Sequence, residues 1–190
     1  MEAHDGPSDF RLNPAHDRQE FLKDGAWPRP AAVLVPICER GGCANVILTE
    51  RTKTLRAHAG QIAFPGGRQD EGDNSPLHTA LREAEEEIGL AAEHVTILGF
   101  LDAYLTGTGY LVSPVVGVVS ADFVARPEPR EVADVFEVPL GFLMNPNNHQ
   151  THDRDISGKS RRYVAMPFED RYIWGATAGM LKNLYDRVYS

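Results

Sequence analysis

Apolar residues recur at helical spacing in two segments of the chain. In residues 77–88 they stand at steps of three and four: Leu77, Ala80, Leu81, Ala84 and Ile88. Residues 177–189 repeat the spacing with Met180, Leu181, Leu184 and Val188. Such a stripe is typical of an amphipathic α-helix that buries one face. Ser75 and Pro76 suit an N-cap and a first helical turn, and Gly89 suits a helix end, so the first helix is predicted between them.

Shorter apolar runs predict strands. The clearest are residues 31–37, 45–49, 95–105, 111–119 and 162–166, with a short one at 135–138. A short helix is expected at 140–144, and the polar stretch 145–160 is expected to be a loop. Strands with two inserted helices predict an α+β fold, a sandwich with one helix on each side of a mixed sheet.

Composition and charge narrow the class of protein. The chain has 190 residues, which is the usual length of one domain. A net charge of −8 argues against a nucleic-acid partner, because neutralising phosphates needs a basic surface. The sequence has no apolar run long enough for a membrane span, and its N-terminus lacks the apolar core of a signal peptide.

The ends and the cysteines complete this outline. Residues 1–30 are polar and carry prolines, so we expect a partly ordered arm ahead of one domain over 31–190. Cys38 and Cys43 fit no strong metal motif and make no disulfide framework, which favours a cytoplasmic location. The oligomeric state, monomer or homodimer, is left open.

Acidic residues crowd the end of the first predicted helix. Glu83, Glu86 and Glu87 stand at i, i+3 and i+4 and therefore share one face. Like charges at this spacing repel, and the C-terminal end of a helix disfavours negative charge. Two interpretations follow: a solvated acidic face, or a site for a divalent cation, which prefers oxygen ligands.

A glycine pair precedes this helix at short range. Phe64 and Pro65 lead into Gly66 and Gly67, which allow a ligand to approach the backbone closely. Four cations cluster around the pair and could balance the charge of a phosphate substrate: Arg51, Lys53, Arg56 and Arg68.

Taken together, these residues resemble the Nudix hydrolase signature. That signature is Gly, five residues, Glu, seven residues, then Arg-Glu-aliphatic-x-Glu-Glu-x-Gly-aliphatic, and residues 82–90 match its second half except for the small Ala84. Counting forward from Gly67 puts Asp73 in the first acidic position, with one residue too many before Arg82. Counting back from Arg82 puts Asn74 there instead, so the role of Asp73 stays open.

A second resemblance is to the coenzyme A pyrophosphatase branch of that family. Its additional signature is Leu-Thr-x-Arg-Ser, three residues, Arg, three residues, Gly, three residues, Phe-Pro-Gly-Gly. Residues 48–67 keep this spacing, with Thr52 in place of serine. Stretches at 106–110, 131–140 and 173–177 also look like bacterial members, so the resemblance covers about residues 31–187.

The resemblance implies a Nudix-like α/β/α sandwich and a metal-dependent pyrophosphohydrolase. Mg²⁺ or Mn²⁺ would be held by Glu83, Glu86 and Glu87, with Arg82 orienting a carboxylate. The substrate would be CoA or a derivative, split to adenosine 3′,5′-bisphosphate and 4′-phosphopantetheine.

The resemblance also implies a substrate side. Arg51, Arg56, Gly66 and Gly67 are expected to bind the substrate there. His58 and Gln61 are expected on the same surface, although for His58 a packed or hairpin-capping role is favoured over a chemical one.

Two points stay open at the level of sequence. Glu131 is a candidate general base, although an exposed loop glutamate explains it equally well. Two other functions compete: a Nudix hydrolase of ADP-sugars or dinucleotides, and a non-catalytic Nudix-fold binding or sensor module. Modules of that kind often lose metal carboxylates, whereas this chain keeps three. The sequence does not give the acyl preference or the number of metals.

Overall fold

The computed structural model describes residues 6–9, 11–13, 28–54, 58–156 and 159–189. Within them, the larger sheet has eight strands: β1 (Arg29–Arg40), β2 (Cys43–Arg51), β3 (Ile62–Ala63), β4 (Gly66–Arg68), β5 (Val95–Phe100), β6 (Tyr104–Leu105), β7 (Tyr110–Val119) and β8 (Val132–Pro139). Its main path runs β3-β2-β1-β7-β5, with β4 beside β1, β6 beside β7 and β8 beside β2. β1 and β7 are parallel and the other pairs are antiparallel, so the sheet is mixed.

A smaller antiparallel sheet and three helices complete the described fold, together with short 3-10 turns at Ala92–His94 and Pro146–Asn148. The sheet contains β9 (Gln150–Ile156), β10 (Lys159–Phe168) and β11 (Arg171–Trp174), and the helices are α2 (Pro76–Ile88), α3 (Leu140–Leu143) and α4 (Ala176–Tyr189).

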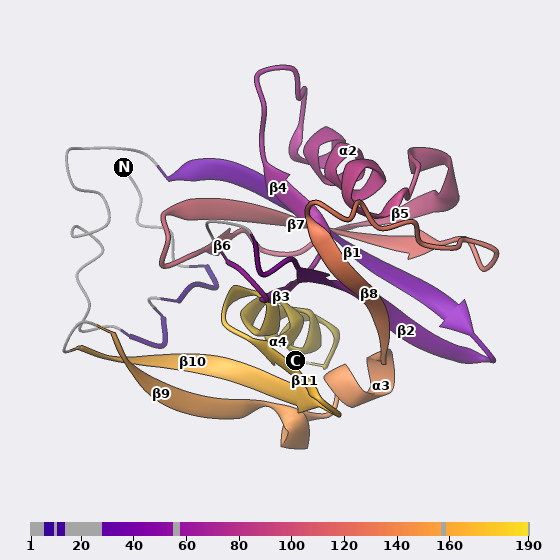
Figure 1. Cartoon of the computed structure of the whole chain (residues 1–190). Coiled ribbons are helices and arrows are strands. Elements are labelled where there is room, and N and C mark those ends of the chain that lie inside the picture. Colours follow the sequence, from indigo (N-terminus) through magenta and orange to yellow (C-terminus); the bar gives the residue numbers. More distant parts are fainter. Residues whose placement is uncertain (1–5, 10, 14–27, 55–57, 157–158, 190) are drawn as a thin grey trace.

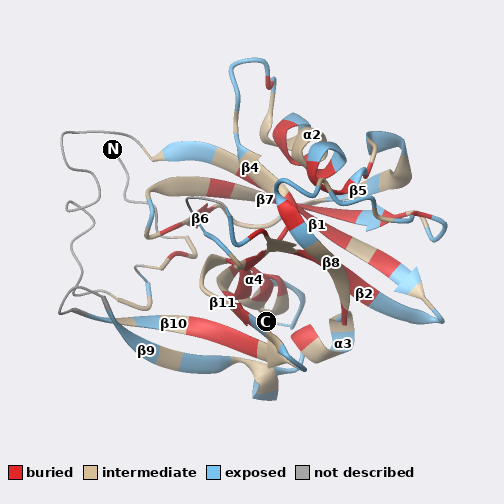
Figure 2. Cartoon of the chain, in the orientation of Figure 1, coloured by how far each residue is buried: buried red, intermediate tan, exposed pale blue. Residues whose placement is uncertain are grey.

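Alternation along the central strand β1 creates two cores. Ala32 and Leu34 face the core under α2, whereas Val33 and Val35 face the core that α4 and the smaller sheet cover. Successive residues of a strand point to opposite faces, so one apolar strand serves both layers. Figure 1 shows α2 on one side of the sheet and α4 on the other, and Figure 2 shows both helices turning buried residues inward. The predicted sandwich is confirmed.

The limits of α2 agree with the sequence prediction. The Ser75 hydroxyl accepts a hydrogen bond from the His78 amide at 3.1 Å, and Pro76 opens the first turn. Gly89 has a φ of +69°, the left-handed conformation that a glycine adopts readily, and it donates to the Glu85 carbonyl at 2.9 Å.

Two sequence predictions about strands were wrong. Residues 95–105 do not form one strand, because β5 ends at Phe100 and β6 begins at Tyr104. Between them Leu101 donates to the Pro114 carbonyl of β7 at 3.0 Å, but a proline has no amide hydrogen to donate in return, so the ladder is interrupted there.

Residues 145–160 are not a loop either. They include β9, whose polar side chains are largely exposed and whose backbone pairs with β10. An outer strand needs no apolar face when the ladder satisfies its backbone, so hydrophobic periodicity missed it. The short strand β11 was also not predicted.

The described part of the N-terminal arm is attached to the fold. The Asp9 carboxylate accepts hydrogen bonds from the Tyr104 hydroxyl and the Gly107 amide, both at 2.6 Å. Asn13 exchanges two hydrogen bonds with the Arg162 backbone. Among the described residues, no helix is long and apolar enough to cross a membrane.

Candidate active site

The three predicted metal ligands lie on α2 at different depths. The Glu87 side chain is 3% exposed, Glu83 is 16% exposed and Glu86 is 60% exposed. α2 comes close to the sheet because it buries the small residues Ala80 and Ala84 against it. The acidic face therefore stands at the margin of a tight interface and not on a remote, fully solvated surface.

The glycines of β4 make room for these carboxylates. A Cβ atom on Gly67 would lie 2.5 Å from the carboxylate carbon of Glu83, too close for two non-bonded atoms. At Gly66 a Cβ would lie 2.5 Å from the Ala32 carbonyl oxygen, and its amide donates to Glu87 at 3.2 Å. The carboxylates and the glycine backbone thus meet directly, which only residues without a side chain permit.

Asp73 anchors Arg82. This contact gives Asp73 the role that the spacing of the Nudix signature left open. The Arg82 guanidinium donates to both Asp73 carboxylate oxygens, at 2.9 and 3.0 Å. The Asp73 carboxylate is almost fully buried and also accepts from the Thr79 hydroxyl at 3.0 Å and the Asp70 amide at 3.0 Å. A two-pronged contact of this kind fixes the plane of the guanidinium as well as its position.

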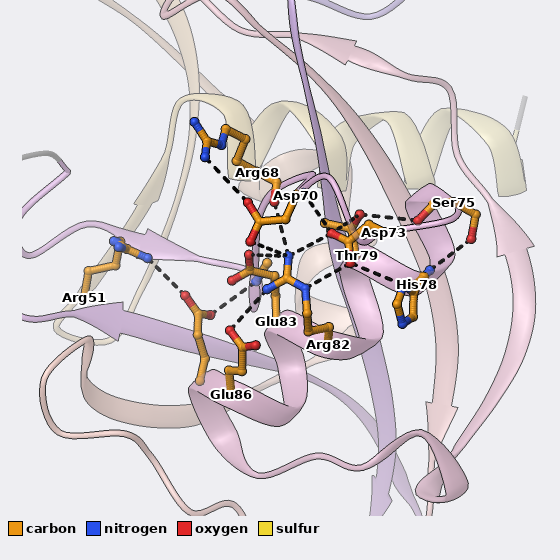
Figure 3. Close-up of polar contacts among 12 residues, drawn as sticks. Arg51, Arg68, Asp70, Asp73, Ser75, His78, Thr79, Arg82, Glu83 and Glu86 are labelled. Atoms are coloured by element: carbon orange, nitrogen blue, oxygen red, sulfur yellow. Dashed lines mark hydrogen bonds and ion pairs between the residues drawn. The ribbon is translucent and has the colours of Figure 1, made fainter.

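Arginines lie between or beside the helix carboxylates. Arg82 contacts Glu83 at 3.0 Å and Glu86 at 3.1 Å, and Arg51 contacts Glu87 at 3.1 Å. Figure 3 shows Arg82 at the centre of this network, with Arg51 reaching in from β2. Within the described residues, no group of three or more His, Cys, Asp or Glu side chains is arranged so that it could hold a metal ion. Each of the three glutamates of α2 instead contacts a guanidinium.

Burial makes the negative charges of this face costly. It raises the pKa of Glu87 to about 7, although Arg51 and the Gly66 amide act against the rise. Burial also raises the pKa of Glu83, against the effect of Arg82. Hydrogen bonds from Arg82 instead hold the pKa of Asp73 well below its usual range.

Glu131 contributes to the electrostatics of this face. It is exposed, and its charge raises the pKa of both Glu83 and Glu87. Like charges gathered in a partly buried place favour the binding of a cation. The donor set, carboxylate oxygens with backbone close by, fits a hard divalent cation such as Mg²⁺.

Not all of the residues predicted on the substrate side can be placed at the site. Arg51 lies at the site, whereas Arg56 falls outside the described residues. His58 Nδ1 and Gln61 Oε1 lie 2.7 Å apart in the connection after β2, as a hairpin contact would place them. Trp174, from the stretch 173–177 that resembles bacterial members of the branch, packs its ring edge-on against Tyr163, with centroids 5.3 Å apart.

Sequence reasoning missed two groups in this network. Thr79 is a buried polar residue on α2, and Asp70 contacts Arg68 at 3.5 Å and Arg82 at 3.9 Å. The sequence carried one signal for Thr79, its position next to Ala80 of the apolar stripe. Its hydrogen bond to Asp73 is seen only in the structure. Asp70 carried none, since a loop aspartate is ordinary.

Comparison with known proteins agrees with this geometry. A family model described as NUDIX domain matches residues 28–157. An uncharacterized Nudix hydrolase, NudL of Escherichia coli O6:H1, is 41% identical over 167 residues, which cover 88% of this chain and 86% of that protein.

Two solved structures resemble the fold. The Nudix hydrolase RenU from M. smegmatis has a TM-score of 0.59 at 21% identity and covers 86% of this chain and 87% of its own. The NUDIX domain of Shewanella oneidensis NrtR, complexed with ADP ribose, has a TM-score of 0.54 at 16% identity and covers 94% and 97%. Hydrolases of this kind generally use divalent metal ions. On the family match and the curated relative together, the chain belongs to the Nudix family and is a pyrophosphohydrolase of nucleoside diphosphate derivatives.

Proposed function

We propose that the protein hydrolyses the diphosphate linkage of coenzyme A or a CoA derivative. The products are adenosine 3′,5′-bisphosphate and 4′-phosphopantetheine, and the reaction depends on Mg²⁺ or Mn²⁺. One observation carries the proposal: the stretch 48–67, which resembles the CoA pyrophosphatase signature, meets the acidic helix directly. Arg51 of that stretch contacts Glu87, and Gly67 adjoins the Glu83 carboxylate.

The carboxylates of Glu83, Glu86 and Glu87 hold the cation in this proposal. When bound, the cation stabilises charge on the phosphate oxygens and acidifies a water molecule. Arg82 is a positioning residue: Asp73 fixes it, and it in turn holds Glu83 and Glu86. This positioning role explains why Arg82, which Asp73 holds through two hydrogen bonds, lies between the carboxylates of Glu83 and Glu86.

The residues around the cation bind the substrate and move the proton. Water attacks one phosphorus atom, and the bond from that phosphorus to the bridging oxygen breaks. Glu131 accepts the proton of the attacking water. Arg51 and Arg56 are expected to bind the diphosphate, and the backbone of Gly66 and Gly67 admits a phosphate close to the chain.

A second substrate class has support of its own. The solved NUDIX domain of S. oneidensis NrtR is complexed with ADP ribose. ADP-ribose and other ADP-sugars present the same diphosphate to the same residues, so they are the main alternative to CoA.

Product analysis separates these possibilities. Pure protein with Mg²⁺ or Mn²⁺ is incubated with CoA, acetyl-CoA, ADP-ribose or NADH, and the products are identified by mass spectrometry, with Glu86→Gln as control. Adenosine bisphosphate from CoA alone supports the proposal. Cleavage of ADP-ribose or NADH but not CoA overturns the proposed substrate and keeps the chemistry. Cleavage of none of the four overturns the proposed substrate as well and points to another nucleoside diphosphate derivative.

The location of the protein, the class of its partner and the kinetic role of Arg56 stay predictions. These are a cytoplasmic location, a nucleotide-like small molecule as the partner in place of nucleic acid or membrane, and a larger effect of Arg56→Ala on KM than on kcat. The division into an arm over 1–30 and a domain over 31–190 is likewise a prediction.

A further inference from the structure

Glu87 is a buried carboxylate with two hydrogen-bond partners of different kinds. Its Oε2 accepts from the Gly66 amide at 3.2 Å, and its Oε1 accepts from Arg51 Nη1 at 3.1 Å. Only 3% of the side chain is exposed, so water compensates little of its charge. Among the described residues, Arg51 is the cation in direct contact with this carboxylate.

A divalent cation and Arg51 compete for the same charge. Either one stabilises the buried carboxylate, because an opposite charge favours the ionised form. With both present, two positive charges would share one carboxylate that water screens poorly. Occupation of the carboxylates therefore weakens the hold of Glu87 on Arg51.

The attachment of Arg51 allows its side chain to leave while its backbone stays. The backbone amide donates to the Gln61 carbonyl at 3.0 Å, and the carbonyl accepts from the Gly60 amide at 3.1 Å. The guanidinium, in contrast, makes one described ion pair through one nitrogen.

Arg82 shows the opposite design. Its Nε and Nη2 donate to the Asp73 carboxylate, and Nη2 also donates to the Arg68 carbonyl. Of the two arginines that contact the glutamates of α2, Arg82 is fixed and Arg51 is exchangeable.

We propose that Arg51 is an exchangeable counter-charge through which binding of the metal promotes binding of the substrate. While the carboxylates hold no cation, Arg51 balances Glu87. When they hold one, Arg51 turns to the diphosphate of the substrate. This inference rests on the proposed function, and by linkage the nucleotide must tighten metal binding by the same factor as the metal tightens nucleotide binding.

Mn²⁺ binding without substrate, followed by electron paramagnetic resonance, tests the exchange. We compare Arg51→Gln with Arg68→Gln, which removes the same charge from an exposed residue that pairs with Asp70. Arg51→Gln is expected to bind Mn²⁺ at least about threefold more tightly than Arg68→Gln, the scale of one partly screened ion pair. Arg51→Lys, which keeps the charge, is expected to stay near the wild-type affinity.

A second measurement covers the case in which Arg51→Gln folds poorly. In EDTA its melting temperature is expected to fall below that of Arg68→Gln, and Mn²⁺ is expected to raise it by more. If the wild type binds no Mn²⁺, the proposed function fails and this inference fails with it. If the wild type binds Mn²⁺ but Arg51→Gln binds it no more tightly than Arg68→Gln, only the inference is overturned, and Arg51 instead orients Glu87 for the metal.

Discussion

The two long helices cover opposite faces of one sheet and do so with opposite chemistry. α4 buries large apolar side chains, with Met180, Leu181 and Leu184 in the core. α2 fully buries one large apolar side chain, Ile88, beside the small Ala80 and Ala84, and adds a glutamate that is almost fully buried. Both helices read as amphipathic in sequence, yet only α2 carries charge into the protein.

The difference separates packing from function. A helix that served stability alone would do as α4 does, since each large apolar side chain that leaves water stabilises the fold. α2 gives up part of that gain so that its glutamates reach the glycine backbone of β4. Substitutions on α2 should therefore affect turnover, and substitutions on α4 should affect stability.

The largest expected effect is the loss of turnover in Glu83→Gln. The amide keeps the size of the side chain but removes the charge beside Gly67, so kcat should fall at least about a hundredfold. Steady-state kinetics measures the loss, and the melting temperature should change little. Glu85→Gln is the matched control, because Glu85 is an exposed residue of the same helix. An equal loss in both variants would remove the distinction between the two faces of α2.

The reverse pattern is expected for Leu181→Ala in α4. Leu181 is fully buried, so the change leaves a cavity and should lower the free energy of unfolding by about 2–5 kcal/mol. Urea unfolding measures the loss, and Val188→Ala, at an exposed position of the same helix, is the control. The kcat of the folded variant should match the wild type; a strong loss would mean that α4 also shapes the site.

Gly67→Ala tests the contact between β4 and the carboxylates. The new methyl group displaces the Glu83 carboxylate, so kcat/KM should fall about ten- to a hundredfold while the backbone conformation stays accessible. Gly72→Ala is the control, since a Cβ at that position meets no atom within 4 Å. Equal activity of both variants would show that the close approach has no catalytic purpose.

The smallest effect, and one that depends on pH, is expected for Asp73→Asn. The carboxylate is held ionised by Arg82, so its removal should lower the free energy of unfolding at pH 7 by about 1–3 kcal/mol. Because the pKa of Asp73 is depressed in the folded protein, this stabilisation is present above pH 4 and is lost as the pH falls below it. Denaturation at pH 7 and pH 3 measures the gap between wild type and variant. A gap that widens at pH 3 would contradict the assignment.

The sequence predicted the parts of this account that local rules determine. The caps of α2, the shared face of its glutamates and the apolar stripe of α4 follow from spacing along one chain segment. The strand β9 escaped prediction because its outer position lets it be polar on most of its length.

Contacts between distant segments were beyond the sequence. The spacing of the Nudix signature could not decide whether Asp73 or Asn74 fills its first acidic position. The hydrogen bonds between Asp73 and Arg82 depend on how the loop folds back. Arg51 and Glu87 lie 36 positions apart, so their ion pair appears only when β2 and α2 are assembled. Nothing in the sequence indicated that Asp9 would attach the N-terminal arm to Tyr104.

Direct binding of Mn²⁺ tests the central claim, that the acidic face of α2 is a metal site. Mn²⁺ affinity is measured in the absence of substrate for the wild type, Glu86→Gln and Glu85→Gln. The account predicts that the wild type and Glu85→Gln bind alike and that Glu86→Gln binds at least about tenfold more weakly, since even an outer partner of a metal ligand is worth that much. Equal affinities in all three proteins would contradict it, and the glutamates of α2 would then be a solvated face held by arginines.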